Sequence, residues 1–399
     1  MNQLSPTKRA VIGVQFLFVA FGATVLVPLL VGIDPAVALF TAGVGTLIFH
    51  LITKGQVPVF LGSSFAFIAP IIACTKAYGF PGTLSGLIAV GLVYGLVSAL
   101  VKSQGLRFIE KLFPSVVVGP VIMLIGLSLA PEAIKMANGN WWIALASLVT
   151  AIVVVVFGKG MLKLVPVFCG IVVGYLVSVY FGIIDFAKIT DAAWFQLPNF
   201  TRPEFSWGAI LYMIPVAIAP IIEHVGDMYA IGSVADKDFV QKPGLHRTLL
   251  GDGVATAFAG FFGGPPNTTY SEVTGAISLT KVVDPRVLRI AACTAICFAF
   301  CGKINGFLQS IPVEVLGGIM ILLFGMIANV GIKTLVDSKT DIQKTRNQVI
   351  ISVVLCIGIG GAQFTWGNFN LAGIGLASLV GVILNLILPN DSKPVHIDK

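Results

Sequence analysis

The chain has 399 residues, of which 56% are hydrophobic and only 11% are charged, and its mean hydropathy is +0.96. A soluble domain usually carries about 25% charged residues, so this composition excludes an ordinary soluble protein and predicts one that crosses a membrane many times. The net charge of +7 is compatible with nucleic-acid binding. The basic residues are spread over many short loops rather than one patch, so we expect no nucleic-acid partner.

The apolar sequence falls into blocks separated by short loops. The first block follows MNQLSPTKRAVIGVQFLF, which lacks a small-residue cleavage site, so we expect a first span rather than a signal peptide. We therefore predict an all-α polytopic membrane protein in contact with lipid, with 14 transmembrane segments. In chain order the blocks cover residues 10–31, 35–53, 58–74, 81–102, 114–131, 142–157, 161–183, 209–233, 248–262, 267–280, 286–301, 311–330, 347–362 and 370–388.

The basic residues support this number of spans. If the N-terminus lies in the cytoplasm, the loops place 20 of the 25 Lys and Arg on the inner side. The five on the outer side are Lys76, Lys135, Lys188, Arg202 and Lys303. This asymmetry follows the positive-inside rule. One missed span would move every later loop to the opposite side of the membrane and would destroy the asymmetry. Both termini are therefore predicted to be cytoplasmic.

The two halves of the chain resemble one another. FPSVVVGPVIMLIGLSLAPEAI at 113–134 aligns with IPVEVLGGIMILLFGMIANVGI at 311–332, and GSSFAFIAP at 62–70 aligns with NTTYSEVTG at 267–275. Each half then holds seven spans, and an odd number makes the second half enter the membrane from the opposite side. The sequence thus predicts a 7+7 inverted repeat, which is typical of transporters.

The segments at 62–70 and 267–275 are poor starts for a continuous helix, because small and hydroxyl residues interrupt the apolar sequence there. We predict that each is a short extended piece followed by a half-helix, in the discontinuous third and tenth segments. The two pieces would pair as short antiparallel β-strands at the membrane midplane. Such backbone is tolerated in a membrane where it is buried in protein or lines a cavity. Both half-helix N-termini would then point at a central site.

Three acidic residues interrupt apolar spans. Glu223 and Asp227 lie four residues apart in the eighth block, on one helix face, and Glu272 opens the tenth block. A charged group in a bilayer costs on the order of 3 kcal/mol, so such residues are functional candidates. No Lys or Arg in the same spans neutralises them. We therefore expect proton coupling, with sodium coupling as the alternative.

Several other polar or reactive residues are assigned structural roles. His224 is expected to be packed and hydrogen-bonded, and Asp252 to be solvated or to cap a helix near a span end. Cys293, Cys297 and Cys301 share one helix face and are expected to be buried packing residues. The sequence contains no motif of a metal site, a nucleophilic hydrolase or a phosphate-binding loop. We therefore predict no cofactor, no metal site and no enzymatic activity.

The predicted site suits a ligand with a flat polar ring. Carboxylates accept hydrogen bonds from ring N–H groups, and backbone N–H groups donate to ring carbonyls. An aromatic side chain stacks on the ring face, and Phe65 on the broken third segment is the candidate. Uracil presents this alternation of donors and acceptors, although the chemistry does not single it out.

Five motifs carry a family resemblance: FGATVLVP at 21–28, GSSFAFIAP at 62–70, EHVGD at 223–227, PGLHR at 243–247 and NTTYSEVTG at 267–275. Over essentially its whole length the chain resembles the bacterial uracil permeases of the nucleobase–ascorbate transporter family, the second class of nucleobase–cation symporters. The resemblance implies a proton-coupled symporter that imports uracil across the bacterial cytoplasmic (inner) membrane by alternating access.

The resemblance also implies two domains. A core domain would comprise spans 1–4 at residues 1–112 and spans 8–11 at residues 209–310. A gate domain would comprise spans 5–7 at residues 113–208 and, with a cytoplasmic tail, spans 12–14 at residues 311–399. Members of this family often form homodimers through the gate, and no pattern in this sequence decides whether this chain does.

By the same resemblance, one pocket binds the substrate. Its residues would be Glu223, Glu272, Phe65, Ala23, Tyr270 and Ser271. Glu223 and Glu272 would be the binding carboxylates, and Glu223, with Asp227, would couple the proton. Phe65 would stack on the base, and the backbone of the remaining residues on the tenth segment would contact the ring carbonyls.

The sequence departs from the family pattern at three of these positions. Val273 stands where the family has Asn, Ser271 where it usually has Gly, and Asp227 where uracil permeases commonly have His. These changes bear on the proton relay and leave the pocket carboxylates intact. The alternatives are a purine or xanthine permease on the same scaffold, an anion transporter of the same architecture, which two carboxylates disfavour, and an integral-membrane enzyme.

Overall fold

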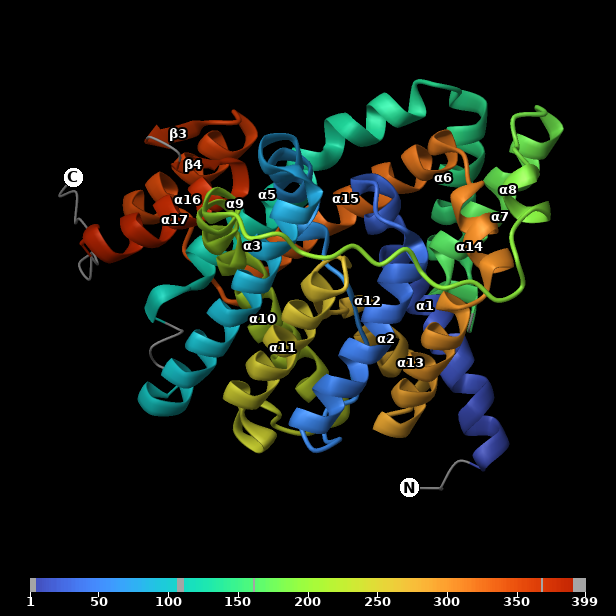
Figure 1. The fold of residues 1–399 in the computed structure, drawn as a ribbon. Helices are drawn as coiled ribbons and strands as arrows, with labels where there is room; N and C mark the ends of the chain where they lie inside the picture. The colour runs from blue at the N-terminus through green and yellow to red at the C-terminus, as the bar shows by residue number, and fades with distance from the viewer. Residues whose placement is uncertain (1–4, 106–110, 161, 367–368, 390–399) are drawn as a thin grey trace.

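The computed structural model describes residues 5–105, 111–160, 162–366 and 369–389, which are mostly helical (Figure 1). For Ala23, Leu164, Ser271, Trp366, Phe369 and Asn370 it describes the backbone only. The helices are α1 (Pro6–Val31), α2 (Pro35–Ile52), α3 (Ile68–Gln104), α5 (Ser115–Ala137), α6 (Trp141–Phe157), α7 (Pro166–Tyr180), α8 (Ala187–Thr190), α9 (Trp207–Met213), α10 (Ile218–Ala235), α11 (Leu245–Phe261), α12 (Ser271–Thr280), α13 (Pro285–Ala299), α14 (Gly302–Gln309), α15 (Val313–Asp337), α16 (Thr345–Ile359) and α17 (Gly373–Ile387). The strands are β1 (Leu61–Ser63), β2 (Asn267–Thr269), β3 (Gln363–Trp366) and β4 (Phe369–Ala372).

Local capping residues set the first helix ends. α1 begins after Ser5, whose side chain accepts a hydrogen bond from the N–H of Lys8, and it ends at Gly32 in the left-handed conformation, with φ of 74°. α2 begins after Asp34, whose carboxylate accepts from the N–H of Ala36 at 2.9 Å. Both helices also carry Pro in their first turn, where its missing N–H costs nothing.

Helix length and composition make the chain a multi-pass membrane protein. Within the described residues, six helical segments are long and apolar enough to cross a membrane. They are Pro6–Val31, Pro35–Ile52, Phe65–Gln104, Ser115–Ala137, Trp207–Ala235 and Val313–Asp337. The shorter apolar helices α6, α7, α16 and α17 accompany them with 15 to 17 residues each. The count of 14 spans stays a prediction.

One helix break falls between two predicted blocks, and another falls inside a block. α3 covers parts of the third and fourth blocks, and its backbone is non-helical at Gly79, where φ is 73° and two helices meet. The eighth block is divided into α9 and α10 by a 3₁₀ turn at Ile214–Ala217, a segment that contains Pro215. The break places the acidic part of this block on a helix of its own, α10.

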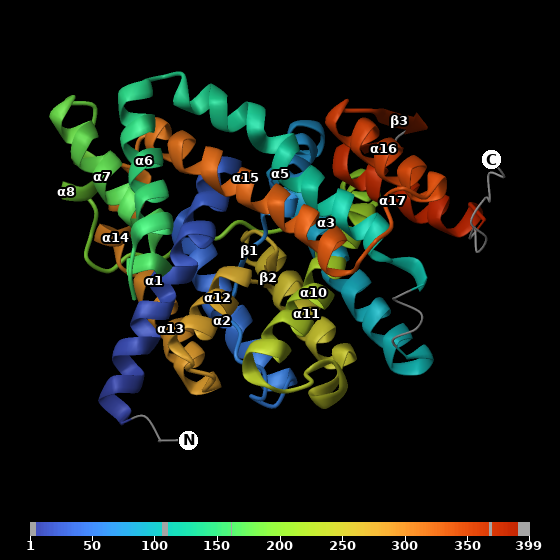
Figure 2. The same cartoon turned by 180° about the vertical axis from the view of Figure 1, so that it is seen from behind.

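β1 and β2 form a two-stranded antiparallel sheet, and Figure 2 shows them close to α12 and α10 near the middle of the molecule. The sheet lies in the segments 58–74 and 267–280, where the sequence predicted extended backbone. The paired residues are Leu61 with Thr269, Gly62 with Thr268, and Ser63 with Asn267.

A second antiparallel sheet, formed by β3 and β4, was not predicted. β4 occupies the start of the block 370–388, which the sequence assigned to a helical span. Gly373 has φ of 56° and separates the strand from the body of α17. The prediction was wrong here because composition alone does not distinguish an apolar strand from the start of an apolar helix.

The helices pack in two sets. In the first set, α2 packs on α11 and α13, α3 packs on α9 and α11, and α1 packs on α13. In the second set, α5 packs on α15 and α16, α6 packs on α7 and α15, and α16 packs on α17. α5 and α15 approach closely because small residues face each other: a Cβ on Gly126 would collide with the backbone of Phe324, and one on Gly331 with that of Gly119.

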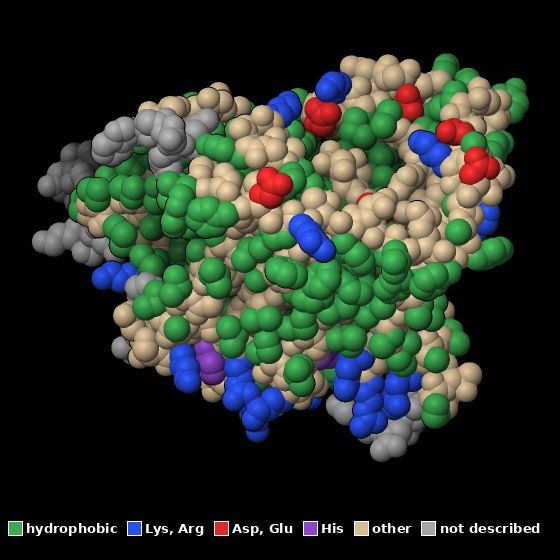
Figure 3. All heavy atoms as spheres, viewed as in Figure 1, with side chains coloured by type: hydrophobic (Ala, Val, Ile, Leu, Met, Phe, Trp, Pro, Cys, Tyr) green, Lys and Arg blue, Asp and Glu red, His purple; other side chains and the backbone are tan. Residues whose placement is uncertain are grey.

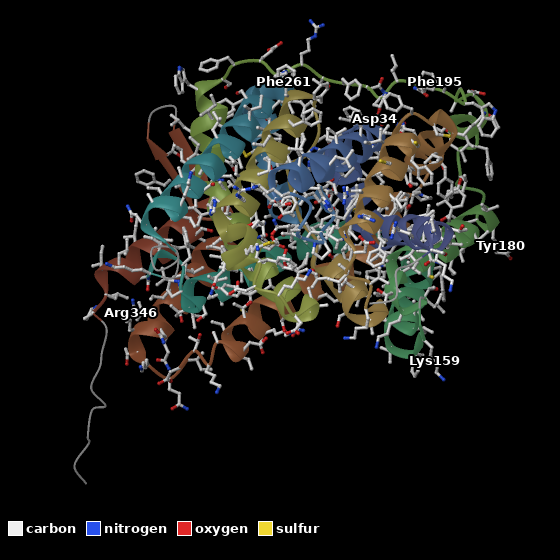
Figure 4. The ribbon with its side chains drawn as sticks, turned by 90° about the horizontal axis from the view of Figure 1, so that it is seen from below. Asp34, Lys159, Tyr180, Phe195, Phe261 and Arg346 are labelled. Atoms are coloured by element: carbon white, nitrogen blue, oxygen red, sulfur yellow. The ribbon has the colours of Figure 1, made fainter. Side chains whose placement is uncertain are left out.

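A long segment from α7 to α9 runs over one end of the first set, past the ends of α2 and α11 that carry Asp34 and Phe261 (Figure 4). The N–H of Asn199 donates to the Asp34 carboxylate at 3.0 Å. Lys188 of this segment donates to the carbonyl of Gln309 in α14, at 3.1 Å. Lys303 of α14 donates in return to the carbonyls of Ile189 and Thr190, both at 2.9 Å. The donors of these bonds, Lys188 and Lys303, are two of the five basic residues predicted on the outer side.

The surface carries a polar end and an apolar belt. Figure 3 shows Lys and Arg side chains gathered along the end near the N-terminal segment and hydrophobic side chains across the middle. Cys293 and Cys297 are exposed and Cys301 is half-buried, so the prediction that they are buried packing residues was wrong. Helical spacing correctly placed Cys293 and Cys297 on one face of α13, whereas Cys301 lies past the end of this helix. The spacing does not say whether that face turns inward or outward.

Candidate functional site

The paired strands bring the starts of two helices together. The sheet contact continues past β1, because the N–H of Ser64 donates to the carbonyl of Pro266 at 2.9 Å. A 3₁₀ turn at Phe65–Phe67 and then α3 follow β1, while α12 follows β2 directly. Because the strands are antiparallel, the two helices leave the sheet in opposite directions.

Two threonines on neighbouring helices brace the strands. Thr46 of α2 donates to the carbonyl of Leu61 at 3.3 Å and accepts from its N–H at 2.9 Å. Thr256 of α11 donates to the carbonyl of Asn267 at 2.9 Å. The Asn267 side chain donates in turn to the carbonyl of Thr41 at 3.0 Å. Backbone that would be costly inside a membrane is thus satisfied by neighbouring helices.

Glu272 lies in the first turn of α12, and its side chain is exposed. No side chain caps this helix start, and the Glu272 carboxylate hydrogen-bonds to the backbone of its own residue. Gly275 lies one turn further on the same face, where a Cβ would meet nothing within 4 Å. The first turn of α12 therefore faces open space with a carboxylate and a positive dipole end.

Glu223 lies on α10, which packs against α12. Its side chain is half-buried, and Gly226, on the same face, also borders open space. The charges that act on Glu223 come from Asp227, Glu272 and Asp252, and all of them are negative. The structure therefore brings Glu223 and Glu272, from distant parts of the chain, within reach of each other's charge.

Asp227 is directed toward the sheet. It is buried, and Thr269 of β2 donates to its carboxylate at 2.7 Å. This bond joins α10 to the strand that leads into Glu272. The sequence singled out Asp227 but not Thr269, because one threonine in an apolar protein carries no signal of its own.

Tyr270 is buried at the turn between β2 and α12. Its hydroxyl donates to the carbonyl of Ser63 at 3.0 Å and accepts from the Thr24 hydroxyl at 3.3 Å. Its ring fills the space in front of Gly62, where a Cβ would collide with it. The Tyr270 side chain thus joins α1 and β1 to the end of β2, which leaves its backbone as the part available to a ligand.

Phe65 is half-buried at the start of the 3₁₀ turn after β1. Its ring meets Phe324 of α15 edge to face, with centroids 6.2 Å apart and planes at 90°. Phe65 therefore lies where the first set of helices meets the second. The side chains of Ala23 and Ser271, which the sequence also placed at the site, lie outside the described part of the chain.

Sequence reasoning missed one polar pair next to the site. His224 Nδ1 lies 2.9 Å from Asp252 Oδ2, and both side chains are fully buried. The expectation that His224 is packed is confirmed, but neither of its ring nitrogens meets the geometry of a hydrogen bond in the described residues, so the expected hydrogen bond is not found. Asp252 was expected to be solvated or to cap a helix, and this was wrong, because it lies inside α11 and faces α10. Only the three-dimensional packing of α10 on α11 reveals the partner.

The arrangement is suited to binding a small polar molecule. Two carboxylates lie on the packed helices α10 and α12, and the paired strands join the start of α12 to the segment that continues into Phe65. Within the described ranges, no group of three or more His, Cys, Asp or Glu residues could hold a metal ion.

The fold is that of membrane transport domains. It is similar to the transmembrane domain of the cyanobacterial bicarbonate transporter BicA, with a TM-score of 0.68 at 16% identity, covering 96% of this chain and 98% of that one. It is also similar to the murine anion transporter Slc26a9 in its inward-facing state, with a TM-score of 0.68 at 12% identity, covering 97% of this chain and 68% of that one. These identities show the fold alone.

Residues 7–366 match the model of the permease family, and the chain therefore belongs to that family. It is 53% identical to a probable uracil permease of Pasteurella multocida over 96% of this chain and 94% of the relative. It is 45% identical to the uracil permease of Bacillus subtilis over 96% and 93%, and 40% identical to that of Escherichia coli over 94% and 90%. The protein is a transporter and not an enzyme.

Proposed function

We propose that this permease imports uracil together with protons across the bacterial cytoplasmic membrane. The observation that carries the proposal is that Glu223 and Glu272, held on α10 and α12, lie within range of each other's charge beside open space. The names of the relatives that align over nearly the whole chain support uracil as the substrate.

In the proposed complex each part of the uracil ring has a partner. Glu223 and Glu272 accept hydrogen bonds from the ring N–H groups, and the backbone at Tyr270 and Ser271 donates to a ring carbonyl. Phe65 stacks on the ring, and Ala23 lines the pocket from α1. The first turn of α12 supports this proposal, because the residue before it, Tyr270, makes no side-chain cap hydrogen bond.

We further propose that the fourteen segments form a 7+7 inverted repeat. The helix contacts support this, because they recur when the halves are exchanged: α1 on α13 corresponds to α9 on α3, and α2 on α13 to α11 on α3. In the second set, α6 on α7 corresponds to α16 on α17, and α6 on α15 to α16 on α5. The braces at Thr46 and Thr256 are related in the same way.

Transport by alternating access follows from this division. The first set of helices forms the core at 1–112 and 209–310, and the second forms the gate at 113–208 and 311–399. The substrate residues belong to the core, while Phe324 of the gate touches Phe65. Movement of the core against the gate would open this contact to one side of the membrane and then the other. A homodimer through the gate is compatible with this movement, since the gate then stays fixed.

Proton coupling rests on the crowding of acids. Four acidic groups this close repel one another when all are charged, so the cluster is expected to hold a proton. Glu223 is the proposed carrier, with Asp227 beside it, because the negative charges of the cluster converge on Glu223. Release of that proton on the inner side would release uracil as well. The basic end in Figure 3 lies beside the start of α1 and supports a cytoplasmic location for the N-terminal segment.

The acids also separate this protein from the anion transporters that share its fold. A bicarbonate or chloride ion at this place would face Glu223 and Glu272, which repel it, whereas a neutral base can use both as acceptors. A purine permease on the same scaffold is the remaining alternative. The two functions are distinguished by which unlabelled base, uracil or a purine, displaces the bound ligand.

Uptake of labelled uracil into proteoliposomes tests the proposal. We expect accumulation that requires an inward proton gradient and is blocked by unlabelled uracil. Equal accumulation without a gradient would exclude proton coupling. Accumulation driven only by a sodium gradient would indicate sodium coupling instead. Competition by xanthine or hypoxanthine, but not by uracil, would favour a purine permease instead.

A further inference from the structure

A polar pair lies beside the proposed site and is not used by it. His224 directly follows Glu223, so its side chain points about 100° further round α10, away from the open space. Its Nδ1 lies 2.9 Å from Oδ2 of Asp252 on α11. On another side, the His224 ring meets Phe49 of α2 at a tilt of 67°, with centroids 6.4 Å apart. Neither side chain of the pair has any exposed surface.

Such a pair is costly to break. A buried carboxylate without a partner loses its hydration uncompensated, so removal of one member of a buried ion pair is strongly destabilising. Neither oxygen of Asp252 and neither ring nitrogen of His224 meets the geometry of a hydrogen bond in the described residues, so the 2.9 Å approach of the two groups is the polar contact that they have. The approach of His224 is therefore what compensates Asp252, and it can persist only while α10 and α11 keep their present register.

α11 carries a second contact one turn after Asp252. Thr256 donates to the carbonyl of Asn267 at 2.9 Å, at the start of β2. The Asn267 side chain donates back to the carbonyl of Ala255 at 3.4 Å. β2 leads through Tyr270 into Glu272. One helix thus holds α10, which carries Glu223, at Asp252, and holds the strand that leads to Glu272 at Thr256.

We propose that His224 and Asp252 are positioning residues, whose contact holds α10 against α11 and thereby fixes the direction of Glu223 relative to Glu272. The inference rests on the proposed binding of uracil between these two carboxylates. The pair itself touches no substrate. Its effect is on affinity, because two acceptors bind one rigid ring well only at one separation and orientation.

Titration of purified protein with uracil tests this inference through three variants. Asp252→Leu removes the acceptor, and we expect it to raise Kd at least about tenfold, which is ~1.4 kcal/mol. Asp252→Asn keeps a carbonyl oxygen for the imidazole N–H, so its Kd should stay within about threefold of the wild-type value. The exchange of both residues, His224→Asp with Asp252→His, should recover most of the affinity that Asp252→Leu loses, because it restores the pair with its members reversed.

A matched control removes a buried hydrogen bond elsewhere. Tyr175 lies 2.9 Å from the Ser310 hydroxyl, away from the acidic residues, and Tyr175→Phe deletes that bond. We expect this variant to bind uracil with the wild-type Kd. If Tyr175→Phe loses as much affinity for uracil as Asp252→Leu does, the loss of any buried polar contact lowers the affinity, and the inference is overturned.

The outcomes separate the two proposals. A wild-type protein that binds no uracil overturns both the proposed function and this inference. A wild-type protein that binds uracil, together with a folded Asp252→Leu variant of equal Kd, overturns the inference alone. If Asp252→Leu fails to fold, the other two variants decide: a folded Asn variant or a folded exchange variant with a Kd raised tenfold or more contradicts a positioning role.

Discussion

The two strand–helix units at the centre of the molecule share a backbone and differ in their side chains. Each begins with a three-residue strand whose first residue is bonded by a threonine of a neighbouring helix. The first unit continues through Phe65 into α3, a helical segment of 37 residues. The second continues through Glu272 into α12, which has only 10 residues.

This difference suggests that the two units, which share one backbone arrangement, contribute different groups to a ligand. The first unit offers an aromatic ring where its helix starts, and the second offers a carboxylate where its helix starts. The units also interlock, because the ring of Tyr270 occupies the space that a side chain at position 62 would need. A bound ring would therefore take its stacking partner from one unit and its charged partner from the other.

The largest effect is expected from the charged unit. Glu272→Ala should lower the uracil affinity about 100-fold, since a hydrogen bond to a charged group contributes about 1.5–3 kcal/mol. Glu314→Ala is the matched control, because Glu314 occupies the same first-turn position of α15. Uptake of labelled uracil into proteoliposomes measures both. Equal losses in the two variants would mean that Glu272 acts only as a helix-end charge.

The contact between the units comes next. Gly62→Ala should destabilise the folded protein by about 2 kcal/mol, because the new methyl group overlaps the Tyr270 ring. Gly95→Ala in α3 is the control, since nothing lies within 4 Å of a Cβ there and alanine favours a helix. Thermal unfolding in one detergent compares them. An unchanged midpoint for Gly62→Ala would show that the units can separate without cost.

A smaller effect is expected from the aromatic unit. Phe65→Leu should raise the Kd for uracil about tenfold, because stacking of a base on an aromatic side chain contributes about 1–3 kcal/mol. Phe65→Tyr keeps the ring and should bind nearly as the wild type does. Titration calorimetry on the purified variants measures this, and a Leu variant with the affinity of the Tyr variant would remove Phe65 from the site.

The smallest effect compares the two braces. Thr46 makes two hydrogen bonds to β1, whereas the Thr256 hydroxyl makes one to β2. With about 1 kcal/mol for each bond, Thr46→Val should destabilise the protein by roughly 1 kcal/mol more than Thr256→Val. Melting temperatures of the two variants in parallel test this order, and the reverse order would contradict it.

Much of the centre of this fold could be predicted from sequence because its signals are local. Small and hydroxyl residues at matching positions of the two halves predicted extended backbone at 62–70 and 267–275, and strands lie there. Glu223 and Glu272 stood out because acids are expensive inside apolar spans. Their mutual approach could not be predicted in the same way, since it depends on the packing of α10 against α12.

The errors share a physical cause. The apolar run that includes β4 was read as the start of a helix, and Cys293 and Cys297 were read as buried. Asp252 was read as a solvated or capping residue although it is buried against His224. In each case the local pattern left two structures possible, and a packing partner decides between them, such as His224 for Asp252 and the adjacent strand β3 for β4.

Equilibrium binding of labelled uracil to purified protein tests the central claim most directly, with Glu223→Gln and Glu272→Gln measured beside the wild type. The two acids come from different segments yet are proposed to serve one ligand. We predict one uracil bound per wild-type chain and a loss of at least about tenfold in affinity in each variant alone, since each keeps only one of the two carboxyl groups that are proposed to hold the ring. Wild-type affinity in either variant would contradict a site shared by both carboxylates.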